Sequence, residues 1–232
     1  MVTNNTFNNQ VLAADVIFNG GTMSIGTDAT SGAINIGTGA AARTTTIGNT
    51  SGASVLALKC GTGDMTLASA TGTIISANDT GEITYPLQSA FLAYNSVTDS
   101  NVTGDGTVYH IIYDTEVFDQ NSDYNNGTGN FTAPITGRYR LATLNRIENL
   151  IAASTDAAID FVTSNRTYHC WNGAIGLIRG GSGLFAMQVN TLADMDAADT
   201  AFVQFSVAGA TKTVGVTGNA DAYTVFSGQL EC

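Results

Sequence analysis

The stretch YDTEVFDQNSDYNNGTGNFTAPITGRYRL, residues 113–141, carries the pattern that decides the fold. Large side chains, one acid and one glycine recur in it at fixed offsets, with polar and turn-forming residues between them. These markers are Tyr113, Asp119, Tyr124, Phe131, Gly137, Tyr139 and Leu141. Short segments of this kind, bounded by Gly, Asn, Asp and Pro, are typical of β-strands joined by turns.

Three further segments extend the pattern. Ser89-Ala90-Phe91 precedes it, Thr128 to Pro134 lies within it, and Phe226-Ser227-Gly228-Gln229-Leu230 follows near the C-terminus. Together these motifs closely resemble the signature of the complement C1q globular-head family, relatives of the tumour necrosis factor fold. Tyr113 replaces a Phe of that signature and Leu141 replaces its last Phe. Both changes keep a large side chain, so we expect the packing to be preserved.

The resemblance covers the C-terminal two thirds of the chain and implies a ten-stranded jelly-roll head that assembles as a tight homotrimer. The signature residues, with Phe226 and Gly228 of the closing strand, would then supply the core and the trimer contacts. Agreement is weakest from Ile151 to Asp199, where Ala198-Asp199 replaces the usual Gly-Asp turn of the family.

The composition places the whole chain in the all-β class. Of its 232 residues, 44% are hydrophobic and 12% charged, as in an ordered protein, and its 26 glycines with abundant Thr and Asn favour short strands and turns. A net charge of −11 with two lysines, Lys59 and Lys212, argues against nucleic acid or anionic lipid as a partner. The sequence has neither the roughly 20-residue apolar run of a membrane span nor the basic start of a signal peptide. We therefore expect a soluble chain without membrane insertion, either part of a longer fibre or a virion component.

The N-terminal part follows an 11-residue repeat. Its units contain Ser24-Ile25-Gly26-Thr27, Asn35-Ile36-Gly37-Thr38 and Thr46-Ile47-Gly48-Asn49, with Ala57-Leu58 in phase. Each unit predicts a short alternating strand. After Leu58 the alternation continues at Met65-x-Leu67 and Thr73-x-Ile75 without the period.

One repeat unit offers only two or three inward side chains, so it needs neighbours to bury them. Three chains can each supply one face, which favours a trimeric β-prism or triple β-helix over a single-chain solenoid. The pattern resembles the shafts of viral, phage and bacterial adhesin fibres, and a Gly/Thr-rich linker is the alternative. Because Pro86 separates the two patterns, we predict a shaft at residues 1–85 and a head at residues 86–232.

Catalytic chemistry finds little support in the sequence. It contains two histidines, His110 and His169, and lacks Gly-x-Ser-x-Gly, a phosphate loop and a zinc signature. His169 and Cys170 are adjacent, but neighbours in a strand point to opposite faces and rarely bind one metal ion. We predict no enzyme activity and no catalytic residue.

Two acidic clusters are candidates for calcium, which takes oxygen ligands. They are Asp114, Glu116, Asp119 and Asp123, and Asp194, Asp196 and Asp199. C1q-type heads resemble modules that often carry calcium at the trimer apex, whereas solvated acidic loops are the alternative. We expect no cofactor, with calcium as the single candidate.

Trp171, the only tryptophan, lies near Tyr168 and Asn172 and forms the candidate ligand-binding site. An exposed aromatic ring can pack on a sugar while amides bond its hydroxyls. The high average burial of large aromatics favours a core position instead. Cys60, Cys170 and Cys232 are an odd set without metal-like spacing, so we expect free thiols, with a Cys170–Cys232 bridge or an interchain bridge at Cys60 as alternatives.

These observations predict an extracellular fibre tip or adhesin, at a cell surface or on a virion. As a homotrimer it would attach a phage, virus or bacterium to a cell-surface glycan or glycoprotein. One alternative is a structural spike or decoration protein without a specific ligand, and another is a tip that degrades glycans. The fold alone does not identify the ligand.

Overall fold

The computed structural model of the chain describes Thr44, Ile47, Leu56, residues 58–60 and residues 62–232. The 11-residue repeat lies almost entirely outside this part of the chain, so its strands stay a prediction. The alternation expected after Leu58 does form strands, in a three-stranded antiparallel sheet in which Leu67 pairs with Ile75. Its strands are β1 (Met65–Ser69), β2 (Gly72–Ala77) and β3 (Ile83–Thr84).

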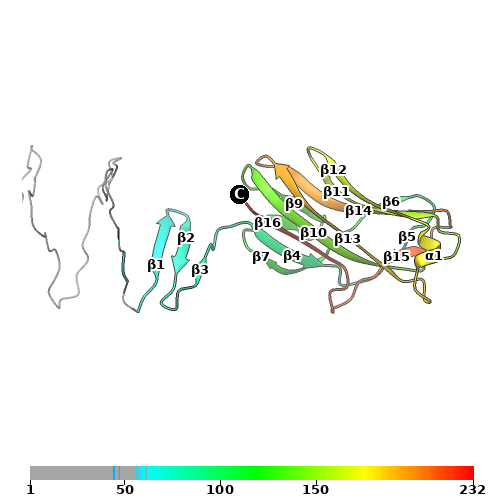
Figure 1. Cartoon of the computed structure of the whole chain (residues 1–232), viewed down its shortest axis with the longest axis horizontal. Helices are drawn as coiled ribbons and strands as arrows, with labels where there is room; N and C mark the ends of the chain where they lie inside the picture. The colour runs from blue at the N-terminus through cyan, green and yellow to red at the C-terminus, as the bar shows by residue number, and fades with distance from the viewer. Residues whose placement is uncertain (1–43, 45–46, 48–55, 57, 61) are drawn as a thin grey trace, which may run out of the picture. The chain divides into compact units, whose positions relative to one another are not determined.

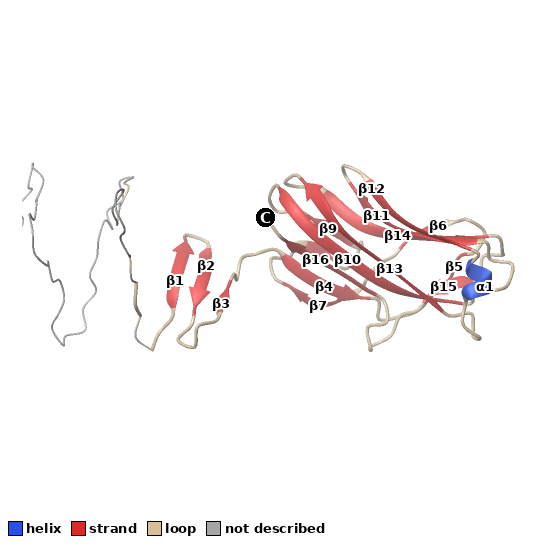
Figure 2. Ribbon diagram, viewed as in Figure 1, coloured by secondary structure: helices blue, strands red, loops and turns tan. Residues whose placement is uncertain are grey.

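The head is built from two antiparallel sheets packed face to face (Figure 1). Sheet I contains β4 (Ala90–Tyr94), β5 (Asp99–Thr103), β7 (Thr115–Asp119), β10 (Gly137–Glu148), β13 (Phe185–Met195), β15 (Val214–Val216) and β16 (Val225–Leu230). Sheet II contains β6 (Val108–His110), β8 (Tyr124–Asn125), β9 (Asn130–Thr132), β11 (Asp156–Thr163), β12 (Thr167–Gly173) and β14 (Thr200–Ala208). The helix α1 (Ile175–Ile178) follows β12 (Figure 2). Among the described residues, no helix has the length and apolar character that crossing a membrane requires.

The strands pair from the outside of the chain inwards. The opening strand β4 pairs with the closing strand β16, β9 pairs with β14, β10 with β13, and β11 with β12. These nested pairs place β4, β16, β10 and β13 in sheet I and β9, β14, β11 and β12 in sheet II. This connectivity defines a jelly roll and confirms the all-β fold expected for the head.

The two ends of the head differ in what they carry. The chain enters β4 and leaves β16 at the same end, because Ala90 pairs with Gln229. The loops at residues 149–155 and 174–184, the second of which includes α1, lie at the opposite end (Figure 1). We call the first the entry end and the second the loop end.

The core is a cluster of stacked aromatic rings between the sheets. Phe91 of sheet I stacks on Tyr124 and Phe131 of sheet II, with ring centroids 4.8 and 5.0 Å apart, and meets Phe226 edge-on at 4.9 Å. Tyr139 packs against Phe131 at 5.3 Å. All five rings are buried, as the signature predicts.

The remaining signature positions serve the same packing. Tyr113 and Leu141 are also fully buried, and the Tyr113 hydroxyl donates to Asn145 Oδ1 at 2.7 Å inside the core. Asp119 instead shapes a turn, because its carboxylate accepts hydrogen bonds from the backbone N–H groups of Asp123 and Tyr124 at 3.1 and 3.0 Å.

At two glycines of the signature, neighbouring atoms lie too close to the Cα atom to leave room for a side chain. A Cβ at Gly228 would lie 2.5 Å from Phe91 Cε1 and 3.0 Å from Leu141 Cδ2. A Cβ at Gly137 would lie 2.7 Å from Leu230 Cδ1 and 2.8 Å from the carbonyl oxygen of Cys232. Any side chain at these two positions forces neighbouring core or backbone atoms to move.

Ala198 departs from the family pattern at a strained position. It adopts φ 73°, a left-handed backbone that favours glycine. The turn before β14 therefore carries an alanine at a backbone conformation that favours glycine.

We predict that Gly228→Ala lowers the free energy of unfolding by about 1–3 kcal/mol, because the new methyl group overpacks against a ring held in a stack. Denaturant titration of the full chain at a fixed protein concentration measures it. Gly181→Ala is the matched control, since nothing lies within 4 Å of its Cβ position, and we expect a change within about 0.5 kcal/mol. Equal stability of the two variants would contradict the close approach.

We predict that Ala198→Gly raises the free energy of unfolding by a few tenths to about 1 kcal/mol, because it relieves the left-handed strain at an exposed residue. The neighbouring Ala197, which has no positive φ, provides the control. Ala197→Gly should lower stability slightly, since it only adds freedom to the unfolded chain. Denaturant titration measures both variants, and a lower free energy of unfolding in both would refute the strain at Ala198.

Candidate functional site

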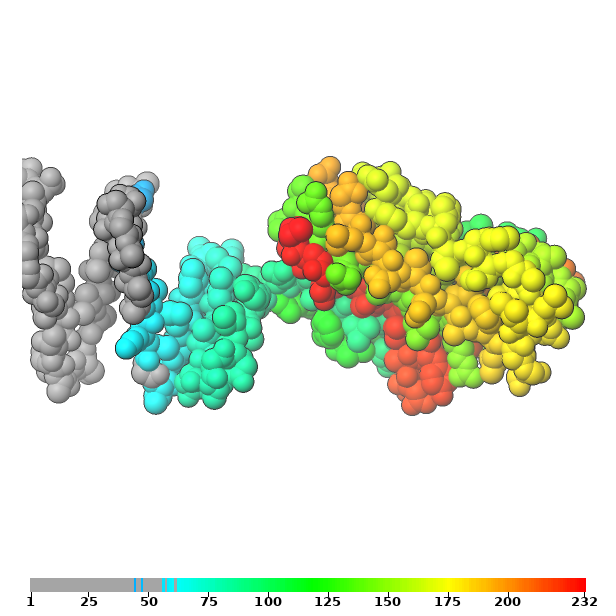
Figure 3. Space-filling model, in the orientation of Figure 1, coloured from blue at the N-terminus to red at the C-terminus, as the bar shows by residue number. Residues whose placement is uncertain are grey.

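Trp171 lies on β12, the edge strand of sheet II, on the side that faces solvent. Its side chain is 65% exposed, so it does not take the core position that the average burial of large aromatics favours. In the chain direction it stands two residues before the end of β12, close to the loop end of the head. The yellow part of the chain in Figure 3, which includes β12 and α1, forms the surface there.

Tyr168 and Asn172 do not share a surface with Trp171. Side chains alternate along a strand, and Tyr168 and Asn172 stand opposite the buried Phe161 and Ala157 of β11. Both therefore belong to the core side of the sheet, and Tyr168 packs against the core. Of the three predicted ligand-binding residues, only Trp171 presents its side chain to solvent on the outer face of sheet II.

A row of polar side chains crosses the outer face of sheet II beside Trp171. His169, Asp160, Gln204 and His110 stand in register on β12, β11, β14 and β6. The Asp160 carboxylate is only 7% exposed. It lies 2.9 Å from His169 Nδ1 and accepts a hydrogen bond from Gln204 Nε2 at 3.1 Å. Both oxygens are bonded, so the orientation of His169 and Gln204 is set by the sheet.

His110, at the end of this row, is less accessible to water than His169. Its ring packs on Phe202, with centroids 4.3 Å apart, and its Nε2 atom is buried. Burial disfavours the charged imidazolium and lowers the pKa of His110 below the ordinary histidine value.

His169 and Cys170 are not placed to bind one metal ion together. Cys170 pairs with Ile159 and packs on the core side of β12, whereas the His169 side chain faces solvent. Cys60, Cys170 and Cys232 are all free thiols in the described part of the chain.

Asp114 and Asp199, one residue from each acidic cluster, are occupied by internal hydrogen bonds. Asp114 accepts bonds from the backbone N–H and the hydroxyl of Ser96, both at 2.8 Å. Asp199 accepts bonds from Asp196 N and Asn165 Nδ2, both at 2.8 Å. Within residues 62–232 and the few others described, no three His, Cys, Asp or Glu side chains gather as metal ligands. These contacts explain the acids as loop supports and add nothing for calcium.

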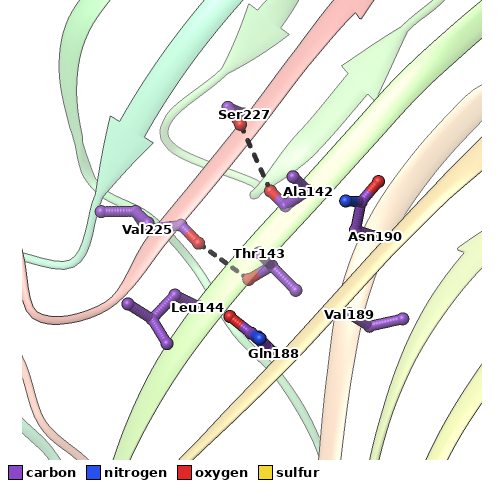
Figure 4. Close-up of a pocket in the computed structure, with 8 residues that line it drawn as sticks. All are labelled: Ala142, Thr143, Leu144, Gln188, Val189, Asn190, Val225 and Ser227. Carbon is purple, nitrogen blue, oxygen red and sulfur yellow. Dashed lines mark hydrogen bonds between the residues drawn. The ribbon is translucent and has the colours of Figure 1, made fainter.

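The solvent side of sheet I is a second candidate surface, which motif-based reasoning did not locate. A groove of about 360 Å³ runs between β13, β10 and β16. Figure 4 shows side chains from these three strands around it, with the small Ala142 and Ser227 flanked by Leu144, Val225 and Asn190. A second groove of about 220 Å³ shares Ala142 and Ser227 and extends over β4 and β7.

The sheet I face is apolar at its centre and charged at its ends. Phe118, Leu144 and Leu192 are 49%, 39% and 50% exposed on it. Arg140 pairs with Glu231 near the entry end, and Arg146 lies over the Tyr223 ring near the loop end. An apolar centre with a polar rim is the usual anatomy of a protein interface. The alternation of β10, with Ala142 and Leu144 at non-core positions, is the sequence signal that marks this face.

We predict that His110 makes the head less stable in acid. Because its pKa is lowered by folding, the unfolded chain binds the proton more readily, so the free energy of unfolding falls as the pH drops below about 6.5. His110→Phe keeps the stacking on Phe202 and removes the titrating group. Unfolding at pH 7 and pH 5 should show a smaller loss in the variant, and an equal loss would contradict the burial of His110.

Comparisons with known proteins bear on the fold. No model of a known protein family matches the chain, and no curated protein matches it. Among solved structures, the globular domain of zebrafish complement 1qA protein is 15% identical, with a TM-score of 0.45 over 62% of this chain and 98% of its own. Murine APRIL at pH 8.0 is 12% identical, with a TM-score of 0.43 over 62% and 99%. The PRD1 vertex protein P5 is 8% identical, with a TM-score of 0.42 over 76% and 86%. The strand pairing makes the head a jelly roll, and these structures are similar to it.

Proposed function

We propose that the chain is the tip of a homotrimeric fibre that attaches a phage, virus or bacterium to a cell-surface ligand. In this proposal a shaft at residues 1–85 carries the head at residues 86–232. The ligand is a glycan or a glycoprotein, and the protein acts outside the cell or on a virion.

The open face of sheet I carries the proposal. Its exposed apolar residues and two adjoining grooves form one continuous surface over β13, β10, β16, β4 and β7. Such surfaces on soluble proteins are usually covered by a partner. A second and third copy of the chain are the natural partners, because the resemblance to C1q-type heads implies trimers and the 11-residue repeat needs neighbouring chains.

A threefold ring joins two different patches of each copy. The face of sheet I would supply one of these patches, with its small central residues Ala142 and Ser227 allowing close approach. The solvent side of sheet II points the opposite way and would remain free for a ligand.

The direction of the chain through the head supports a terminal position on a fibre. The chain enters the head at the entry end, where Ala90 pairs with Gln229, so in this proposal the shaft joins the head there. The loop end is then the free end, and Trp171 lies near it. Individually weak sites suffice there, since three linked copies raise avidity by roughly 10²–10⁴-fold.

We predict that Ser227→Arg converts the trimer to a folded monomer, because it places a long charged side chain at the centre of the sheet I face. Light scattering coupled to size exclusion should give three times the chain mass for the wild type and one for the variant. Ser206→Arg, at a solvent-facing position of sheet II, is the matched control and should stay trimeric.

The wild type and Ser227→Arg also test attachment to a ligand. On a glycan array or on host cells, the trimer should bind and the monomeric variant should lose about 10²-fold or more in avidity. A wild-type monomer would refute the assembly, and a trimer that binds neither glycans nor cells would favour the structural spike.

A further inference from the structure

The indole of Trp171 lies down along β12 and does not stand out from it. A Cβ at Gly173 would lie 3.0, 3.5 and 3.7 Å from the Cη2, Cζ3 and Cζ2 atoms of Trp171. Gly173 is two residues further on the same side of the strand, so the far edge of the ring rests where a side chain would otherwise be. Ala158 stands directly opposite Trp171 on β11. Gly173 therefore lies under the far edge of the ring, and the small Ala158 is its cross-strand neighbour; we call these two residues the floor.

One face of the indole ring rests on this floor and the other face is exposed to solvent, which accounts for the 65% exposure of Trp171. A flat, exposed aromatic face is the geometry that packs against the C–H face of a sugar ring. Gly173 has no positive φ, so its backbone does not require glycine. The position of the indole explains the missing side chain.

Fixed polar groups surround this platform. On β11, Asp156 and Asp160 flank Ala158 on the outer side of the sheet, in register with Gly173 and His169 respectively. Thr155 Oγ1 donates to Asp156 at 2.8 Å, and the buried Asp160 is held by His169 and Gln204. Asp156, ordered in this way, accepts hydrogen bonds from hydroxyl groups without a large ordering cost, whereas Asp160 orients the exposed ring of His169.

The charges on the face select the class of sugar. Strands β11, β12 and β14 contain no Lys or Arg, and the chain carries a net charge of −11. The two carboxylates beside the platform repel an acidic sugar, and Asp156 suits a hydroxyl donor. The large exposed apolar side chains on this face, Trp171 and Val108, lie three strands apart. Two such side chains offer far less than the roughly 800 Å² that each partner buries in a stable protein interface.

We propose that Trp171, on its floor of Ala158 and Gly173, is a binding platform for an uncharged hexopyranose, with Asp156 and His169 as its polar partners and Asp160 holding His169 in place. This rests on the proposed attachment function and names its site and sugar class. The platform differs from the grouping with Tyr168 and Asn172, which the alternation of β12 excludes.

Trp171 is the only tryptophan of the chain, so its fluorescence reports the platform directly. Titration of the full-length protein with methyl β-galactopyranoside, methyl β-glucopyranoside and N-acetylglucosamine oligomers should shift the emission for at least one of them. Sialyllactose, the acidic probe, should bind more weakly than lactose.

Three variants locate the site on an array of neutral and sialylated glycans. Trp171→Ala should lower affinity per site on the order of 30-fold, as for other central aromatic contacts. Gly173→Ala keeps the tryptophan but lifts the ring, and should weaken binding several-fold. Val108→Ala, an exposed apolar residue of the same face three strands away, should leave binding unchanged.

Each contrary result has its own meaning. Unchanged glycan binding in both Trp171→Ala and Gly173→Ala overturns the platform and leaves the attachment function standing. Preference for sialylated over neutral glycans overturns the sugar class. Dissociation of the Trp171→Ala trimer places the residue in the subunit contact and also overturns the platform. A wild-type trimer that binds host cells but no glycan overturns the platform alone, and one that binds neither refutes both proposals.

Discussion

Burial of one aromatic stack holds the head together. Phe91 enters on the first strand of the head and packs its ring against Tyr124 and Phe131 from the opposite sheet. Face-to-face and edge-on aromatic contacts add to the free energy of area burial. Because Phe226 closes the same cluster from the last strand, the two ends of the head's chain are joined through its core. The glycine at 228 follows from this packing, since the ring of Phe91 occupies the space of a side chain there.

This core dictates what the two outer faces can carry. Alternation along each strand commits every second residue to the aromatic layer, which leaves the others for solvent or partners. The centre of the sheet I face uses those positions for small and apolar residues, and the outer face of sheet II uses several of them for the polar row beside the indole of Trp171. The same sandwich therefore has one side suited to protein contact and one suited to a small polar ligand.

Much of the head could be predicted because its pattern is local and strongly spaced. The aromatic markers from Tyr113 to Leu141 stand at offsets that match strands and turns, and the structure buries them. Whether the Trp171 side chain is exposed or buried could not be predicted, since an isolated tryptophan is compatible with either face of a strand. Its neighbours Tyr168 and Asn172 were grouped with it by proximity in sequence, whereas alternation separates them.

The amino-acid sequence by itself determined the all-β class and the core aromatics, because hydrophobic spacing and turn residues act over short distances along the chain. Only the tertiary structure decided which residues meet across strands. The row of His169, Asp160, Gln204 and His110 is drawn from four strands, and the grooves around Ala142 and Ser227 from three or more. Register between distant segments sets these neighbours, and register is fixed by the packing of the whole core rather than by any one segment.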